Sequence, residues 1–261
     1  MSMDANALHV DVVGHGPPLV LLHGWAMHGG VFAPLVECLR GHHTLYLVDL
    51  PGHGASHDSA VPLALEPCVE AICAQVPIAP WCGWSLGGLF ALHAAATWPQ
   101  RVPRLAMICA TPRFVRDGDG DWKYGVSKDI FRDFATGLRE DYRGTLERFV
   151  ALEAFGSDHA KDELRALRQQ LFARGAPTAH ALADGLSLLE TTDLRAALPS
   201  LPAGSLWLAG RRDRLVDPRA MRQAAADAPA ARFHLLEHAG HAPFLTHARE
   251  VAAHLTGFLR A

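Results

Sequence analysis

The stretch Gly83-Trp84-Ser85-Leu86-Gly87-Gly88 decides how this chain folds. An apolar run over Ile78–Gly83 precedes it and an Ala- and Leu-rich run over Leu86–Trp98 follows it, so the pattern predicts a sharp turn from a strand into a helix. Glycines at 83 and 87 suit this turn because side chains there would clash. The N–H groups and the positive dipole end of the helix then face the Ser85 hydroxyl. The stretch therefore predicts a nucleophilic serine.

A serine hydroxyl needs a base, and the base needs an acid that orients it. The candidate base is His241, in the loop that follows the apolar run Arg232–Leu236. This placement puts it at the carboxyl edge of a predicted sheet. His238 is the alternative, but it follows the strand too closely to reach far. We therefore expect His241 to be the base.

The candidate acid is Asp213, which follows the predicted strand Ser205–Ala209. Asp217 is the rival, but Asp217-Pro218 is typical of a helix N-cap with proline in the first helical position. This interpretation leaves Asp213 as the acid. The chain order Ser85, Asp213, His241 is that of the α/β-hydrolases and differs from the other two well-known triad orders.

An oxyanion hole requires two backbone N–H groups. One should belong to Leu86, the residue after the nucleophile, and the other to Trp25 in the loop after the predicted strand Leu19–Leu22. The Trp25 indole would then border the acyl pocket. A plain turn is the alternative interpretation of His23-Gly24.

Short apolar runs alternate with longer segments of helical period, which predicts an α/β fold with a mostly parallel sheet covered by helices on both faces. The predicted strands are Leu8–Val13 at an edge, Leu19–Leu22, Leu45–Leu50, Ile78–Gly83, Leu105–Ala110, Ser205–Ala209 and Arg232–Leu236. The predicted helices are Phe32–Leu39, Pro67–Val76, Leu86–Trp98, Pro218–Ala228 and a C-terminal helix from about His247 to Arg260.

No buried strand is predicted between Thr111 and Leu198. Amphipathic stretches around Phe131, Leu146 and Leu164 predict helices there instead. We therefore expect a helical lid over residues 113–198, inserted between the two parts of a core domain, 1–112 and 199–261.

Composition excludes several classes of protein. The 261 residues carry 24 Lys and Arg against 27 Asp and Glu, a net charge of −3, and 49% are apolar, which excludes a disordered or fibrous chain and disfavours a general nucleic-acid binder. No apolar run approaches the length of a membrane span, and the N-terminus lacks a signal-peptide pattern. The five cysteines form no CxxC pair, so we expect reduced thiols in a cytoplasmic monomer.

No cofactor and no metal are expected. The chain has no phosphate-binding loop of the Walker type and no dinucleotide fingerprint. His42, His43, His53 and His57 come without an acidic ligand set, so surface loops are the expected explanation for them.

Over nearly its whole length the chain resembles the α/β-hydrolase superfamily and, more closely, the pimeloyl-[acyl-carrier protein] methyl ester esterases of biotin synthesis. The matching residues are Leu22 to Met27, Asp49 to Ser56, Trp81 to Leu89, Glu147 to Leu152, Leu164 to Leu167, Asp213 and Gly240 to Phe244. The resemblance implies an α/β-hydrolase fold and a serine carboxylesterase. Such an enzyme removes the methyl group from a pimeloyl chain on acyl-carrier protein and releases methanol.

The resemblance also implies roles for individual residues. Ser85, Asp213 and His241 would be catalytic, and Trp25 and Leu86 would form the oxyanion hole. The acyl channel would be lined by lid residues Phe149, Val150, Ala151, Leu152 and Glu153.

Basic residues of the lid offer a docking surface for the acidic carrier protein. Lys161, Arg165 and Arg168 are spaced to share one helix face, and Arg143 and Arg148 flank the preceding stretch. A solvated face is the alternative, because Asp158, Asp162 and Glu163 are interspersed. The resemblance favours docking through Arg143, Arg148, Lys161 and Arg165. The chain departs from the family pattern at Gly144, where a basic residue is expected, and at Lys161, where an arginine is expected, and Lys161 lacks arginine's fork geometry.

Two other functions remain open on the residues alone. One is a general short-chain carboxylesterase, lactonase or carbon–carbon hydrolase with the same triad. The other is a non-catalytic ligand-binding protein of the same fold, which an intact triad disfavours. Serine at the elbow argues against a dehalogenase or epoxide hydrolase, in which the family uses aspartate.

Overall fold

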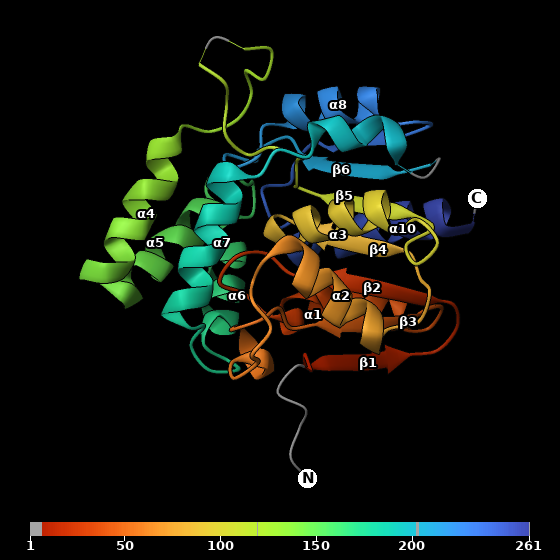
Figure 1. The fold of residues 1–261 in the computed structure, drawn as a ribbon, viewed down its shortest axis with the longest axis horizontal. Coiled ribbons are helices and arrows are strands. Elements are labelled where there is room, and N and C mark those ends of the chain that lie inside the picture. Colours follow the sequence, from red (N-terminus) through yellow and green to blue (C-terminus); the bar gives the residue numbers. More distant parts are fainter. Residues whose placement is uncertain (1–6, 119, 202–203, 261) are drawn as a thin grey trace.

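A seven-stranded sheet forms the centre of the computed structural model, which describes residues 7–118, 120–201 and 204–260 (Figure 1). The strand order is β1-β3-β2-β4-β5-β6-β7. The strands are β1 (Val10–Gly14), β2 (Pro18–Leu22), β3 (Thr44–Val48), β4 (Trp81–Trp84), β5 (Leu105–Ile108), β6 (Leu206–Gly210) and β7 (Arg232–Leu236). Residues 1–6, on which the expectation of no signal peptide partly rests, lie outside the described part.

The sheet is parallel except at one edge, where β1 pairs antiparallel with β3. Every residue of β4, β5 and β6 is buried, as the unbroken apolar runs predict for strands covered on both faces. The edge strand β1 is half-exposed. The predicted α/β fold with a mostly parallel sheet is therefore confirmed.

Helices cover both faces of the sheet. On one face α1 (Ala33–Leu39) packs with α10 (Ala248–Arg260), and on the other α2 (Leu65–Gln75) packs with α3 (Leu86–Thr97) (Figure 1). Helix α8 (Pro218–Asp227) packs on β6 and β7, and the short helix α9 (Pro243–Thr246) leads into α10. Short 3₁₀ helices, η1 (Gly29–Phe32), η2 (Gly54–Ser56) and η3 (Arg195–Ser200), lie in the connections. Within the described residues, no helix is both long and apolar enough to cross a membrane.

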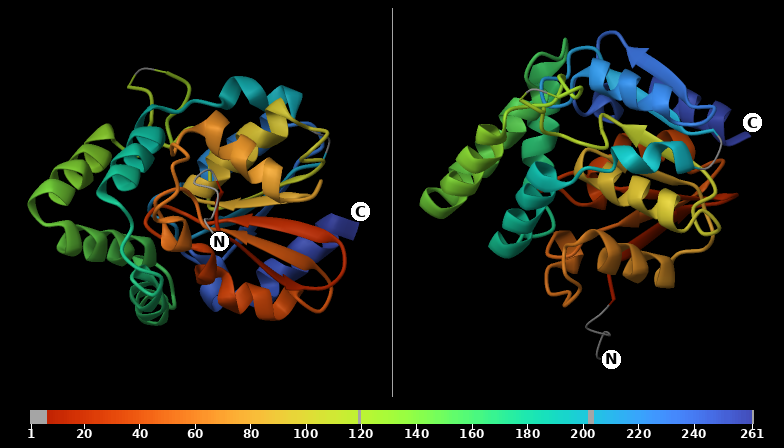
Figure 2. Two further views of the ribbon diagram at one scale, coloured as in Figure 1. Left: turned by 60° about the horizontal axis from the view of Figure 1, so that its bottom comes forward. Right: turned by 45° about the horizontal axis from the view of Figure 1, so that its top comes forward.

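Four helices lie between β5 and β6 and stand to one side of the sheet in all views (Figures 1 and 2). They are α4 (Lys128–Glu140), α5 (Tyr142–Ala154), α6 (Ala160–Leu171) and α7 (Ala179–Thr191), and we call them the insertion. Side chains of Ser127, Asp141 and Thr178 cap the N-termini of α4, α5 and α7. Helix α7 has no counterpart among the amphipathic stretches that the sequence analysis singled out.

Most strand boundaries differ from prediction by one to three residues, and two of these differences have a clear physical reason. The expected strand from Ile78 begins only at Trp81, because the preceding prolines at 77 and 80 interrupt pairing and leave Ile78 exposed. The strand expected to reach Leu50 ends at Val48, where Asp49 turns its carboxylate to accept N–H groups of Gly29 and Ala55 at 2.7 and 2.8 Å.

Arg174, between α6 and α7, joins the insertion to the sheet. Its guanidinium contacts Asp49 Oδ2 at 3.1 Å and Asp11 Oδ2 at 2.5 Å. The Asp49 side chain is fully buried. The Thr178 N–H donates to the Gly52 carbonyl at 2.8 Å and strengthens the same junction.

Replacing Arg174 should therefore destabilise the fold. We expect Arg174→Met to lower the free energy of unfolding by about 2–3 kcal/mol, because it leaves the buried Asp49 carboxylate without its cation. Arg249→Met, at an exposed cation on α10, is the matched control and should change it by less than about 0.5 kcal/mol. Urea denaturation measures both, and equal values for the two variants would contradict the assigned role of Arg174.

Candidate active site

The order of the strands determines where the site lies. The chain goes from β2 to β3 on one side and then crosses back to β4 on the other, so β2 and β4 are neighbours, with Leu22 opposite Gly83. Ligands of parallel α/β sheets bind at the carboxyl ends of the strands at such a reversal. The loop after β2 and the turn after β4 therefore meet there.

Ser85 occupies the sharp turn between β4 and α3. Its backbone has φ 52° and ψ −121°, a conformation that side-chain-bearing residues rarely adopt, and its side chain is only 3% exposed. A Cβ at Gly83 would lie 2.4 Å from the Gly87 carbonyl oxygen, and one at Gly87 would lie 2.3 Å from the Leu22 oxygen. The turn can therefore form only with glycine at both positions.

His241 and Asp213 form a buried pair. The His241 Nδ1 lies 2.8 Å from Asp213 Oδ2, and both side chains are fully buried. Asp213 Oδ1 accepts the N–H groups of Leu215 and Val216 at 2.8 and 3.0 Å. His241 Nε2 is buried and has no hydrogen-bond partner among the described residues. An imidazole held in this way keeps its proton on Nδ1 and leaves Nε2 free to accept one.

Trp84 connects this pair to the serine turn. Its indole N–H donates to the His241 carbonyl at 2.7 Å, and the two rings lie 5.6 Å apart. Because Trp84 precedes Ser85, this bond fixes the His241 loop against the end of β4. The sequence does not predict this role for Trp84, since the middle positions of the motif carry no general residue preference.

The two rival residues lie elsewhere. His238 is 70% exposed and pairs with Asp158 at 2.8 Å. Asp217 accepts the Arg219 N–H at 2.8 Å and caps α8, as predicted. Neither makes a hydrogen bond to the His241–Asp213 pair.

Two backbone N–H groups lie near Ser85. In the described part of the chain no backbone carbonyl accepts from the Trp25 N–H, and Leu86, as the first residue of α3, has no helical carbonyl to bond to. A Cβ on Gly24 would lie 3.2 Å from the Ser85 Cβ, so the Trp25 loop lies against the serine. The His23 ring fixes this loop, because its Nδ1 bonds the Gly24 carbonyl at 2.7 Å and its Nε2 accepts the Leu50 N–H at 2.9 Å.

The Trp25 indole faces the insertion. Its N–H donates to the Leu182 carbonyl on α7 at 2.9 Å, and the Phe149 ring of α5 packs edge-on at 4.5 Å. A Cβ on Gly185 would approach the indole to 2.6 Å. Gly185 was not identified from the sequence, because an isolated glycine in a helix carries no signal of what packs on it.

Only part of the segment 149–153 faces the triad. Phe149 contacts Trp25, and the buried Glu153 follows one helical turn later on the same face. Val150 is fully buried. Ala151 and Leu152 are half-buried, and Ala151 lies about half a turn away from Phe149.

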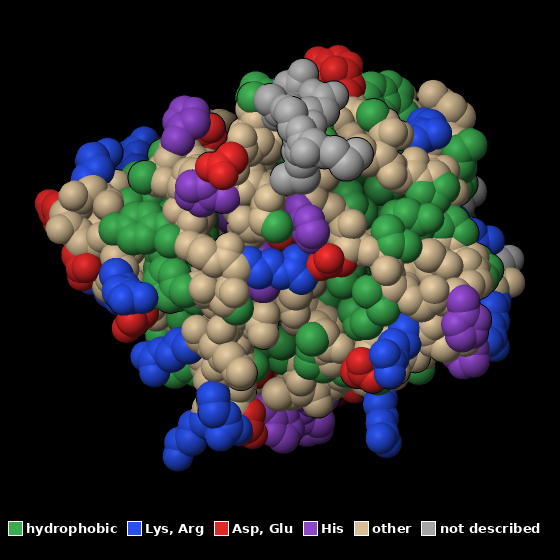
Figure 3. All heavy atoms as spheres, turned by 90° about the horizontal axis from the view of Figure 1, so that it is seen from below, with side chains coloured by type: hydrophobic (Ala, Val, Ile, Leu, Met, Phe, Trp, Pro, Cys, Tyr) green, Lys and Arg blue, Asp and Glu red, His purple; other side chains and the backbone are tan. Residues whose placement is uncertain are grey.

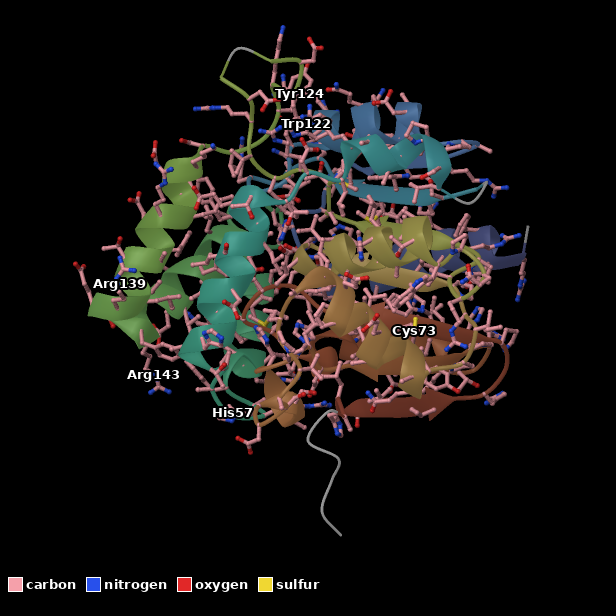
Figure 4. All side chains as sticks on the ribbon, in the orientation of Figure 1. His57, Cys73, Trp122, Tyr124, Arg139 and Arg143 are labelled. Carbon is pink, nitrogen blue, oxygen red and sulfur yellow. The ribbon has the colours of Figure 1, made fainter. Side chains whose placement is uncertain are left out.

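The proposed docking cations lie on the outside of the insertion. Arg143 stacks over Phe172 at 4.5 Å, and Figure 4 shows it at the outer end of the insertion, away from the sheet. Arg148 is 60% exposed and lies 3.8 Å from Asp141. Arg165 pairs with Asp162, whereas Lys161 is exposed and has no ion pair within the described residues.

The pKa values of His241 and Glu153, two ionisable groups near the serine, are both raised, but by different causes. Burial lowers the pKa of His241, but the charge and hydrogen bond of Asp213 outweigh it and raise that pKa above its ordinary value. Burial raises the pKa of Glu153 to about 8. Glu153 is therefore largely protonated at neutral pH.

Cys109, Asp213 and His241 place potential metal-ligand atoms within 4.8 Å of one another. The Asp213 oxygens and His241 Nδ1 are already engaged with each other and with backbone N–H groups. Burial raises the pKa of the Cys109 thiol, which therefore stays protonated, and its Sγ lies 3.6 Å from the Gly240 carbonyl. This donor set fits a metal ion poorly.

Sequence comparisons find similar proteins over nearly the whole chain. The alpha/beta hydrolase fold family model matches residues 17–248. The pimeloyl-[acyl-carrier protein] methyl ester esterase of Xanthomonas campestris pv. campestris (strain B100) is 61% identical over 97% of this chain and 99% of its own length. The enzyme of the same name from Stenotrophomonas maltophilia (strain K279a) is 60% identical over 97% of each chain.

Solved structures show the same fold at low sequence identity. An esterase from Exiguobacterium antarcticum superposes with a TM-score of 0.86 at 22% identity, covering 97% of this chain and 96% of its own. The enol-lactonase from Burkholderia xenovorans LB400 gives 0.84 at 21% identity with the same coverage. These likenesses concern the fold alone.

Removal of the serine hydroxyl tests the arrangement directly. Ser85→Ala should lower kcat for an activated ester about 10⁶-fold and abolish labelling by a fluorophosphonate, because the Ser85 hydroxyl forms the acyl-enzyme and the nearby Cys109 thiol stays protonated. Its stability should change by less than about 0.5 kcal/mol. Ser187→Ala, at an exposed serine on α7, should retain full activity and labelling. Labelling that survives Ser85→Ala would refute the assignment.

The His241 pKa gives a second test. Because the base must be neutral, kcat/KM should rise as pH increases through a value above 6.5 and be lost below it. In Asp213→Asn, the largest effect that opposes burial is lost, so NMR should show the imidazole titrating at lower pH than in the wild type. An unchanged titration would contradict the control that we assign to Asp213.

Proposed function

The chain belongs to the alpha/beta hydrolase fold family and, within it, to the pimeloyl-[acyl-carrier protein] methyl ester esterases, and we propose that it hydrolyses the methyl ester of pimeloyl-acyl-carrier protein through Ser85, His241 and Asp213. The products are the free pimeloyl acid, still on its carrier, and methanol. The observation that carries the proposal is the buried His241–Asp213 pair, held by Trp84 against the Ser85 turn.

The reaction takes two steps. Ser85 Oγ attacks the ester carbonyl while His241 Nε2 takes its proton, and the N–H groups of Trp25 and Leu86 stabilise the oxyanion. His241 then gives the proton to the departing methoxide, and methanol leaves. A water molecule deprotonated by His241 attacks the acyl-enzyme and releases the carboxylic acid. Asp213 stays ionised throughout and holds the imidazole in place.

The insertion acts as a lid in this proposal. Residues 113–198 cover the core formed by 1–112 and 199–261; residues 1–6, 119, 202–203 and 261 of this division lie outside the described part. The triad is buried, so the acyl chain must enter between the lid and the core. The segment Phe149, Val150, Ala151, Leu152 and Glu153 forms the lid side of that channel, with Phe149 and Glu153 on the face turned to the site and Ala151 on the opposite face. Phe149 and Glu153 lie nearest the reacting groups.

Cations of the lid orient the acidic carrier. Two of the three acids interspersed with them do not neutralise this face: Glu163 is buried and bound by Ser157 and Thr246 at 2.7 Å, and Asp158 pairs with Arg212 and His238. Helices α5 and α6 pack together, and their exposed cations act jointly in this proposal as the docking patch: Arg143, Arg148, Lys161 and Arg165. On the face seen in Figure 3, charges of both signs are mixed, so we assign steering to this local patch and not to the overall field.

The setting is the cytoplasm. All five cysteines are free, although only two are partly exposed, which suits a reducing compartment. We propose that the enzyme acts as a monomer; light scattering should then return the mass of one chain, 28.2 kDa.

The decisive assay uses methyl-pimeloyl-acyl-carrier protein beside a free methyl ester of the same acyl length. Mass spectrometry should show loss of one methylene mass from the carrier-bound ester, faster than from the free ester and absent with Ser85→Ala. Turnover of the free ester alone would leave a general serine esterase. No turnover of either ester, together with no labelling of Ser85, would favour a ligand-binding protein.

Charge reversal tests the docking patch. Arg148→Glu with Arg165→Glu should raise KM for the carrier-bound ester about tenfold or more at low salt and leave the free ester unaffected, because rim charges act on encounter. The control is Arg249→Glu on α10, which makes the same Arg-to-Glu change at one position outside the patch. An equal effect of Arg249→Glu, or no effect of the double variant, would remove the docking role.

A further inference from the structure

Glu153 is a buried carboxyl group without a hydrogen-bond partner. Its side chain is 1% exposed, and within residues 7–118, 120–201 and 204–260 neither carboxyl oxygen has a partner. Burying such a group unpaired costs roughly 1–3 kcal/mol or more, so proteins rarely retain one without a use. The triad mechanism above does not need it.

The end of α5 that carries Glu153 lies on the loops of the triad. A Cβ on Gly156 would lie 2.8 Å from the Arg212 carbonyl oxygen, next to Asp213. A Cβ on Gly240 would lie 3.0 Å from the Ser157 Cβ, next to His241. The segment after α5 therefore rests directly on both catalytic loops.

One face of α5 spans the whole reaction centre. Phe149 packs on Trp25, which is the oxyanion side. Glu153 follows four residues later on the same face, and the titratable groups that act on it are His241 and Asp213. The carboxyl group therefore lies close to His241, the residue that gives its proton to the leaving group.

The charge state of Glu153 decides what it can do there. Burial raises its pKa to about 8, with a further rise from Asp213 and an opposing effect of His241. At neutral pH it is thus a carboxylic acid with one O–H donor. A carboxyl group kept neutral by its apolar surroundings can donate a hydrogen bond where a carboxylate could only accept one.

We propose that Glu153 is a further catalytic residue, whose neutral carboxyl group donates a hydrogen bond to the alkoxy oxygen of the bound ester. The proposal rests on the esterase function proposed above. The Glu153 proton is not transferred: the C–O bond breaks, its electron pair goes to the methoxide oxygen, and His241 supplies the proton that makes methanol. The hydrogen bond from Glu153 stabilises the charge that develops on that oxygen.

Esters with different leaving groups distinguish this catalytic role of Glu153 from a purely structural one. Methoxide is a poor leaving group and needs the hydrogen bond, whereas nitrophenoxide leaves readily without it. The experiment compares a methyl ester with a nitrophenyl ester of the same acyl chain. It uses kcat/KM, which for both esters reports the steps up to acylation of Ser85 and not the shared deacylation step.

Two variants of Glu153, one without a hydrogen-bond donor and one with a donor, should differ in their rates on the methyl ester. Glu153→Leu, similar in size and without a donor, should lower kcat/KM for the methyl ester about tenfold at pH 7, which is the value of one hydrogen bond. The nitrophenyl ester should stay within about twofold of wild type. Glu153→Gln retains an N–H donor and should preserve both rates. Equal losses on both esters, or no loss on the methyl ester, would overturn the proposal.

The pH profile is the second arm. In the wild type, kcat/KM for the methyl ester should fall as pH rises through about 8, because ionised Glu153 loses its donor and repels the developing negative charge. Glu153→Gln cannot ionise and should show no such fall. The same alkaline fall in both proteins would assign it to another group and refute the proposal.

A measurement on the unmodified protein does not depend on the folding of any variant. Infrared difference spectra of wild-type enzyme between neutral and alkaline pH should show loss of the C=O stretch of a protonated carboxylic acid, and Glu153→Gln should lack this signal. Absence of the signal in the wild type would show that Glu153 is not neutral and would overturn the proposal.

The assays also separate the two proposals: if neither ester is hydrolysed and Ser85 is not labelled, the esterase function itself has failed. If both are hydrolysed without the leaving-group difference, only the role of Glu153 has failed.

Discussion

The turn from β4 into α3 leaves no room for a Cβ at Gly83 or Gly87, and the site depends on this constraint. Because both positions are glycine, the backbone segments pack closely enough for α3 to start directly behind Ser85. The loop after β2 can lie beside Ser85 for the same reason. The strained backbone at Ser85 costs of order 1–3 kcal/mol, and it persists because buried strands on both sides of β4 fix the turn. The reaction centre is thus a consequence of how the middle of the sheet packs.

Burial then gives two carboxyl groups in one small volume opposite properties. Asp213 accepts two backbone N–H groups as well as the imidazole, so its negative charge is solvated by the protein. Glu153 has no such donors and keeps its proton at neutral pH. The same chemical group is therefore an anion that orients His241 in one place and a neutral donor in the other.

The sequence allowed the strands, the serine turn and the Asp213–His241 pair to be predicted, because each depends on local pattern and on the order of elements along the chain. It could not give Trp84 its bond to the His241 carbonyl, or Gly185 its contact with the Trp25 indole, because these depend on which distant segments meet. The charge state of Glu153 could not be predicted for the same reason. A glutamate on an amphipathic helix is usually solvated, and only the placement of α5 on the triad loops shows otherwise.

The insertion covers both the triad and Glu153, so access to Ser85 and the charge state of Glu153 depend on the same contacts. The triad is buried beneath α5 and α7, so a carrier-bound chain can reach Ser85 only if the contacts of Trp25 with Leu182 and Phe149 yield. Arg174 holds the insertion to the sheet at the α6–α7 connection, and Asp158 holds it to the core at the α5–α6 connection. Opening would admit water to Glu153 and lower its pKa, whereas closure over the ester restores the neutral donor. Water exclusion and the protonation of Glu153 are thus controlled by the same contact between α5 and the core.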